Sequence, residues 1–316
     1  MGPQDIFLNK AGRLRSGWRV GIFIIVFGLT NFLLAWSVRI MFILGRNFFT
    51  IPLIDDLIFR ITLLVSALFA GWFCARLIEG LPWRSLGLGF HERWWWDLLI
   101  GSLVGAGSLL LAALIAFAAG GLRFSFSGTQ FLFATSRALA GTLVLFVVGA
   151  LAEEAVFRGY PLQTLSRARL AWIGILMTSL PFALVHLNNP NVVAGFTFVN
   201  TALAGFWLAL AYLRTRSLWF PLGVHWAWNW ALGSVLGLPV SGLTMTRHTL
   251  FLGHDFGPAW LTGGSYGIEG GLACTVALLI SLAFIWRTRL VAATPEMLKL
   301  TSEENPVASL RSDSSR

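Results

Sequence analysis

Charged side chains are scarce in this sequence: Asp, Glu, Lys and Arg make up only 12% of its 316 residues. Soluble domains carry about 25% charged residues. Hydrophobic residues make up 56% of the chain instead, with 15 Trp and 26 Phe, and the mean hydropathy is +0.74. The composition therefore excludes an ordinary soluble domain and predicts a membrane protein.

Cysteine is also scarce, and the chain lacks internal repeats and low-complexity tracts. The two cysteines, Cys74 and Cys274, lie in or beside apolar stretches and have no metal-type spacing. We interpret them as small buried hydrophobic residues. An internal repeat would have favoured a transporter built from two related halves.

Apolar runs near 20 residues long are present and can cross a bilayer as helices. They predict an all-α fold, a polytopic helical bundle of about eight transmembrane helices. The expected spans are 18–44, 57–78, 97–119, 138–165, 170–188, 192–213, 217–236 and 271–286.

The net charge of +9 would suggest nucleic-acid binding if the basic residues formed one patch. With eight crossings and a cytoplasmic N-terminus, however, Lys and Arg gather in the cytoplasmic segments, as the positive-inside rule requires. We therefore expect a multi-pass protein of the cell membrane with both termini in the cytoplasm. The expected partners are membrane lipids and a substrate, and not nucleic acid.

Three regions are expected along the chain. Residues 1–137 form an N-terminal transmembrane region with an interfacial linker at 80–96, where Trp, Arg and Glu cluster. Residues 138–236 carry the unusual polar groups and form the predicted core. Residues 237–316 contain a Gly-rich outer loop, the last transmembrane helix and a Ser-rich tail from residue 294 that we expect to be disordered.

Ionisable and amide side chains interrupt three of the predicted spans. A charge at the bilayer centre costs about 2.5–3.5 kcal/mol, so such residues are functional candidates. Most of them belong to pairs of residues four positions apart, which share one helix face. The pairs are Glu154 and Arg158, Phe182 and His186, and His225 and Asn229, with Glu153 adjacent to the first.

The depths of these groups agree loosely. At about 1.5 Å per residue from the nearest cytoplasmic arginine, Glu153 lies roughly 21 Å deep, His186 roughly 25 Å and His225 roughly 14 Å. All three would then reach the middle layer of a core about 30 Å thick. This requires the fourth span to continue past Pro161, and we predict a continuous, kinked helix because membrane helices tolerate proline.

The three motifs, Glu153-Glu154-x-x-x-Arg158, Phe182-x-x-x-His186 and His225-x-x-x-Asn229, resemble those of the CPBP family. This family comprises CAAX prenyl endopeptidases and bacteriocin-processing or self-immunity proteins, which are intramembrane proteases. The motifs occur in the expected order, on separate spans, and cover about a third of the chain. The regions before residue 138 and after residue 236 carry no motif of this kind.

The resemblance implies a glutamate-dependent peptidase. Glu153 and His186 would hold and activate one water, and a buried carboxylate suits the role of general base. His225 and Asn229 would present donors to the oxyanion. In supporting roles, Arg158 would offset buried negative charge, Glu154 would orient a histidine, and Phe182 would pack beside His186.

A zinc site is the alternative chemistry, with Glu153, His186 and His225 as ligands and a fourth position open. The HExxH pattern of many metalloproteases is missing, which favours water activation without Zn²⁺. Taken one pair at a time, the same residues could also be a structural ion pair and satisfied core histidines.

The sequence therefore predicts an intramembrane endopeptidase that cleaves a peptide or lipidated protein, with a prenylated CAAX protein as one candidate substrate. A non-catalytic membrane scaffold or immunity protein that binds a peptide is the alternative, although a binder has no need of a water-activating pair. A transporter is disfavoured because the intramembrane charges form one cluster. Glu269 and the three histidines outside the motifs, His91, His248 and His254, are expected to be ordinary loop residues.

Overall fold

The computed structural model describes residues 4–9, 12–44, 52–127, 132–193 and 195–301, and in these it is almost entirely helical. The α-helices are α1 Gln4–Phe7, α2 Ser16–Leu44, α3 Pro52–Phe73, α4 Trp94–Ala118, α5 Leu132–Glu154, α6 Tyr160–Arg167, α7 Ala171–His186, α8 Phe196–Thr215, α9 Trp219–Trp230, α10 Ala259–Thr262, α11 Leu272–Arg287 and α12 Pro295–Thr301. Turns of π-helix extend α3, α5 and α9 at Cys74–Ile78, Ala155–Gly159 and Ala231–Val235. The all-α prediction is confirmed.

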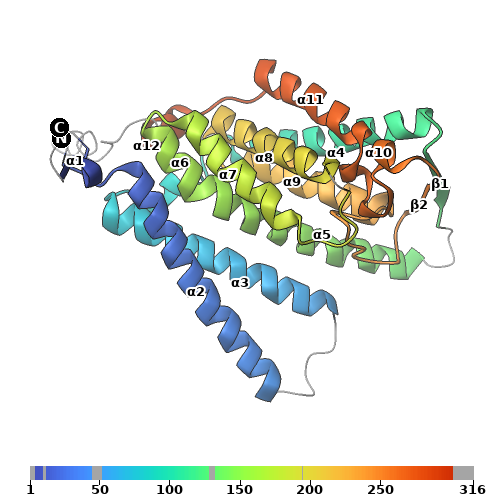
Figure 1. The fold of residues 1–316 in the computed structure, drawn as a ribbon, viewed down its shortest axis with the longest axis horizontal. Coiled ribbons are helices and arrows are strands. Elements are labelled where there is room, and N and C mark those ends of the chain that lie inside the picture. The colour runs from blue at the N-terminus through green and yellow to red at the C-terminus, as the bar shows by residue number, and fades with distance from the viewer. Residues whose placement is uncertain (1–3, 10–11, 45–51, 128–131, 194, 302–316) are drawn as a thin grey trace.

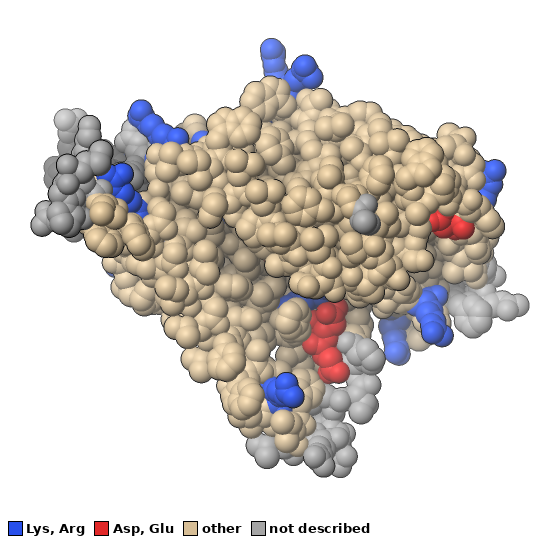
Figure 2. Space-filling model, in the orientation of Figure 1, with Lys and Arg blue, Asp and Glu red and all other residues tan. Residues whose placement is uncertain are grey.

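Within the described residues, five helical segments are long and apolar enough to cross a membrane: Ser16–Ile43, Leu53–Ile78, Trp94–Ala118, Phe133–Arg167 and Phe196–Thr215. The apolar helices α7 and α11 are shorter, at 16 residues each. The chain is a multi-pass membrane protein, while the number of eight spans and the cytoplasmic termini stay predictions. The face in Figure 2 agrees, because the broad surface of the bundle is almost free of charged side chains, which lie near its edges and in the hollow beside the α2–α3 hairpin.

The helices form one bundle from which a hairpin of α2 and α3 leans away (Figure 1). Helix α3 packs on α5, and α9 packs against α4, α5 and α8. Helices α1 and α12 lie at one end of the molecule, and the ribbon of strands β1 Leu122–Phe126 and β2 Phe251–Asp255 lies at the other. The strands are antiparallel, with Phe124 opposite Gly253.

Glycines allow α4 and α9 to approach each other at backbone distance. A Cβ atom built on Gly105 of α4 would lie 2.1 Å from the carbonyl oxygen of Val224, and one on Gly223 of α9 would lie 2.4 Å from that of Leu98. Small residues at helix contacts give membrane helices this close van der Waals packing. The position of α9, which carries His225, therefore depends on these glycines.

Helix α5 continues into α6 through the π-helical turn Ala155–Gly159, which confirms the predicted continuous helix past Pro161. Proline has no backbone N–H and its ring crowds the preceding turn. A π-helical turn adds a residue to the helical turn, and such turns are frequent at functional sites. The turn lies next to Glu153 and Glu154 and contains Arg158.

One local expectation, the disordered tail, is wrong in part. Residues 295–301 of the tail, expected to be disordered, form helix α12, whereas residues 302–316 lie outside the described part. The long loop 237–270 contains β2, α10 and short 3₁₀ turns. Arg19 and Arg167 are both buried. Each forms an ion pair with the carboxylate of Glu79.

Candidate active site

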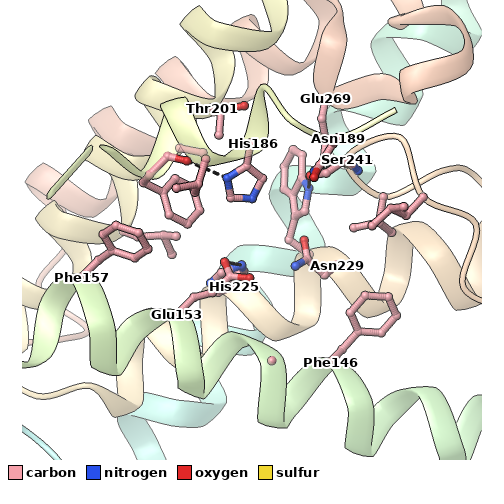
Figure 3. A pocket seen from close by; sticks show the side chains of 18 of the residues that line it. Phe146, Glu153, Phe157, His186, Asn189, Thr201, His225, Asn229, Ser241 and Glu269 are labelled. Atoms are coloured by element: carbon pink, nitrogen blue, oxygen red, sulfur yellow. Dashed lines mark hydrogen bonds and ion pairs between the residues drawn. The ribbon is translucent and has the colours of Figure 1, made fainter. Parts of the chain in front are cut away.

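A cavity of about 550 Å³ lies between α3, α5, α7, α8 and α9 and the loops that follow α7 and α9. The four predicted catalytic residues, Glu153, His186, His225 and Asn229, all line it (Figure 3). They come from three different helices, as the motif spacing required. The sequence therefore located residues that do share one cavity.

The two adjacent glutamates face different environments. The side chain of Glu153 is 26% exposed and lines the cavity, whereas that of Glu154 is completely buried. Adjacent residues on a helix point about 100° apart, which separates their surroundings. Only Glu153 can therefore meet a reactant in the cavity, and Glu154 acts through protein groups.

The imidazole of His225 lies between the two carboxylates. Its Nδ1 is 2.9 Å from Glu154 Oε1, a hydrogen bond, and its Nε2 is 3.6 Å from Glu153 Oε2. An ionised carboxylate only accepts hydrogen bonds, so Nδ1 carries the proton and donates. This hydrogen bond fixes the ring, and it directs Nε2 toward Glu153 and the cavity.

Arg158 supports this arrangement from behind the cavity wall. Its Nη1 donates to Glu154 Oε1 at 3.2 Å, and its Nη2 donates to the backbone carbonyl of Gly205 at 3.0 Å. The guanidinium also lies over the ring of Phe182, 4.7 Å from its centroid. The guanidinium neutralises one buried carboxylate and joins α5, α7 and α8.

His186 lies on the opposite wall of the cavity from Glu153 and His225 (Figure 3). Its Nδ1 is 2.6 Å from the backbone carbonyl oxygen of Phe182, and the two rings are 4.5 Å apart. A carbonyl can only accept, so Nδ1 is the donor and Nε2 is left available to the cavity. The predicted contact between Phe182 and His186 is present.

The three side chains of the zinc alternative do not form one ligand set as they stand. Glu153 and His225 are adjacent, but within the described ranges no group of three His, Cys, Asp or Glu side chains is close enough to hold a metal ion. Zn²⁺ needs at least three protein ligands at about 2 Å. Binding of Zn²⁺ by this set would require its three side chains to come closer together.

Glu269 was interpreted as a loop residue, but it lines the far end of the same cavity. Its Oε1 accepts a hydrogen bond from Trp228 Nε1 at 3.0 Å, and its Oε2 accepts from the backbone N–H and hydroxyl of Ser241. Burial and, to a smaller extent, the charge of Glu269 raise the pKa of nearby Tyr266 to about 12, so its phenol stays neutral. The isolated acid in a Gly-rich loop was the sequence signal for this site.

His91 was also expected to have no special role, yet it is 2% exposed. Its Nε2 lies 3.1 Å from the hydroxyl of Ser217 and 3.5 Å from Asp97 Oδ2. Burial lowers the pKa of His91 below 6.5, with Arg84 and Arg93 adding to the effect. This contact joins the linker 80–96 to the segment that precedes α9.

The comparisons with known proteins agree with the motifs. Residues 135–231 match the family model described as type II CAAX prenyl endopeptidase Rce1-like. This segment, about a third of the chain, contains all three motifs, so the resemblance to the CPBP family seen in the sequence is confirmed. No curated protein and no solved structure matches the chain.

Proposed function

We propose that the protein is an intramembrane endopeptidase of the cell membrane. It hydrolyses a peptide bond of a membrane-associated substrate with a water activated by Glu153. The observation that carries the proposal is the cavity itself, where this carboxylate faces two imidazoles and an amide from separate apolar helices. The family match over residues 135–231 supports the same class of reaction.

Glu153 is the general base of the proposed reaction. Its Oε2 makes no hydrogen bond within the described part of the chain, so it has free capacity to accept one from water. The carboxylate takes a proton from water as the oxygen attacks the carbonyl carbon, and it later returns the proton to the leaving amine. Nε2 of His186 holds the same water from the other wall, because its Nδ1 is already engaged.

His225 and Asn229 stabilise the oxyanion in this scheme. The two glutamates contribute two negative charges and Arg158 one positive charge, so an imidazolium at His225 brings their sum to zero. In an environment of low dielectric, such neutrality is strongly favoured. Its Nε2–H and the amide of Asn229, one helical turn further, then point donors at the developing negative charge.

Arg158, Glu154 and Phe182 position the reacting groups. The guanidinium holds Glu154, and Glu154 holds the Nδ1 of His225. Phe182 packs its ring against both His186 and Arg158. These buried contacts keep the imidazoles in place without touching the substrate.

The substrate is a peptide with an apolar or lipid anchor, such as a prenylated CAAX-type protein. The side of the cavity formed by α2 and α3 contains the apolar side chains Phe27, Phe59 and Leu63. An anchor dissolved in lipid can approach along this apolar wall without leaving the membrane. The peptide portion then extends toward Glu153.

Substitution of Glu153 tests the function. We expect Glu153→Gln to lower the rate of cleavage of a model prenylated peptide by about 10²–10⁴-fold, the usual contribution of a general base. Glu92→Gln is the matched control, because Glu92 is exposed in the linker. Purified protein in lipid vesicles and mass spectrometry of the products give the measurement. Full activity of a folded Glu153→Gln protein contradicts the proposal. A wild-type protein that binds the peptide without cleaving it, as a scaffold would, contradicts it as well.

A chelator separates the metal-free mechanism from the zinc alternative. We expect cleavage to continue after dialysis against a strong chelator. Loss of activity that is restored by added Zn²⁺ alone would replace the proposed water activation with a metal mechanism.

A further inference from the structure

Helix α3 brings a charged pair to the cavity that the three motifs do not include. Asp56 and Arg60, one turn apart, both line it. Among the described Lys and Arg side chains, Arg60 is the one that lines this cavity. A guanidinium within a membrane-spanning segment is costly, so such a residue is a candidate for function.

The pair leaves most of the guanidinium unused. Arg60 Nε donates to Asp56 Oδ2 at 3.1 Å, and within the described chain this is its one hydrogen bond. A guanidinium has five N–H donors in a planar fork. The two Nη groups therefore retain their capacity for a bidentate acceptor, even though the side chain is only 17% exposed.

A glycine on α5 makes room for this arginine. A Cβ atom built on Gly149 would lie 2.1 Å from Arg60 Nη1, so any other residue there would displace the guanidinium. Gly149 precedes Glu153 by one helical turn, which is about 6 Å along the axis. Arg60 therefore lies against α5 one helical turn before the proposed general base.

We propose that Arg60 binds the C-terminal carboxylate of the substrate. This inference rests on the proposed function and names a recognition residue for it. The fork of an arginine matches a carboxylate with two parallel hydrogen bonds. Because an extended chain spans about 3.3–3.6 Å per residue, a carboxylate held there places the cleaved bond only a few residues from the C-terminus.

A lipid phosphate is the other anion of similar chemistry, and the geometry disfavours it. Arg60 lies seven residues inside the candidate span Leu53–Ile78, about 10 Å along the helix from its start. Its side chain faces the cavity that holds the reacting groups, while headgroups lie at the membrane surface. A carboxylate that enters the cavity with the peptide reaches it directly.

Two peptides that differ only at the C-terminus, a free acid and an amide, test this assignment. We expect the wild-type protein to cleave the free acid with a kcat/KM about tenfold or more above that of the amide, since hydrogen bonds to charged groups have this magnitude. In Arg60→Gln the ratio should fall toward one, and Arg60→Lys should retain only part of it. Gly149→Ala should lower the ratio as well. Arg39→Gln, an exposed cation on α2, is the control and should keep the wild-type ratio.

Binding measured without turnover separates this inference from the proposed function. Fluorescence anisotropy of both labelled peptides on Glu153→Gln protein should show the same preference for the free acid, and adding Arg60→Gln should abolish it. If no peptide is cleaved but this preference exists, the endopeptidase assignment fails and the carboxylate site stands. Equal binding of acid and amide, or a preference unchanged in Arg60→Gln, overturns the site. A preference for the free acid that appears only in vesicles with anionic lipid also overturns the site.

Discussion

The Nδ1 atom of His225 lies 2.9 Å from Oε1 of Glu154, the second of two adjacent glutamates, while the first, Glu153, faces the cavity. The buried acid therefore orients the imidazole, and the exposed acid is left for a reactant. One pair of neighbouring residues in the sequence thus supplies two different roles through the turn of a helix.

The buried pair Glu154 and Arg158 should be coupled in stability. We expect Glu154→Gln or Arg158→Gln alone to destabilise the fold by about 3–5 kcal/mol, because each leaves the partner charge buried and unpaired. The double substitution should cost less than the sum of the two. Thermal unfolding of the four proteins in detergent measures this coupling. Strictly additive losses would mean that the ion pair contributes nothing of its own.

The glycine contact between α4 and α9 should control both stability and activity. A methyl group in Gly223→Ala meets the backbone of α4 at 2.4 Å and must push the helices apart, which moves His225. We expect a lower melting temperature and weaker peptide cleavage. Gly107→Ala is the control, because a Cβ there meets no atom within 4 Å. Equal tolerance of both substitutions would show that α9 can shift without consequence.

His91 should make the fold sensitive to mild acid. Because its pKa is lowered from 6.5, the unfolded chain binds more protons than the folded chain as the pH falls through 6.5. Stability is therefore lost on acidification below about pH 6.5 and restored above it. Melting temperatures from pH 8 to pH 5 should fall less steeply in His91→Gln.

Nearby acids oppose this effect, which gives the experiment a clear contrary result. Glu92 and Glu296 favour the protonated imidazole, and Asp97 Oδ2 lies 3.5 Å from Nε2. A melting temperature that rises as the pH drops would mean that these carboxylates hold an imidazolium. The cost of burying the charged imidazole would then not determine the pKa of His91.

Glu269 should act as an anchor for the loop over the cavity. Glu269→Gln retains one amide oxygen but loses the charge that accepts hydrogen bonds from Trp228 and Ser241. Since hydrogen bonds to charged groups are worth about 1.5–3 kcal/mol each, we expect a marked loss of stability. Limited proteolysis should cut the segment near Ser241 faster than in wild type. Unchanged cleavage in this segment would argue against the anchor.

The sequence alone was sufficient for the features that depend on residue type and helical period. Scarce charge and long apolar runs predicted a membrane bundle, and the four-residue spacings predicted which side chains share a face. The helix past Pro161 followed from the tolerance of membrane helices for proline, and the common depth of Glu153, His186 and His225 followed from the rise per residue. These are local regularities of an α-helix in lipid, and they need no knowledge of how helices pack.

Only the tertiary structure decided which distant residues meet. The contacts of Glu79 with Arg19, of Arg60 with Gly149, and of Glu269 with Trp228 each join segments far apart in the chain. Neither hydropathy nor spacing within one helix determines such pairs, because they depend on the rotation and crossing of neighbouring helices. The same packing decided which histidine Glu154 meets, because the glycine contacts between α4 and α9 place His225 beside it.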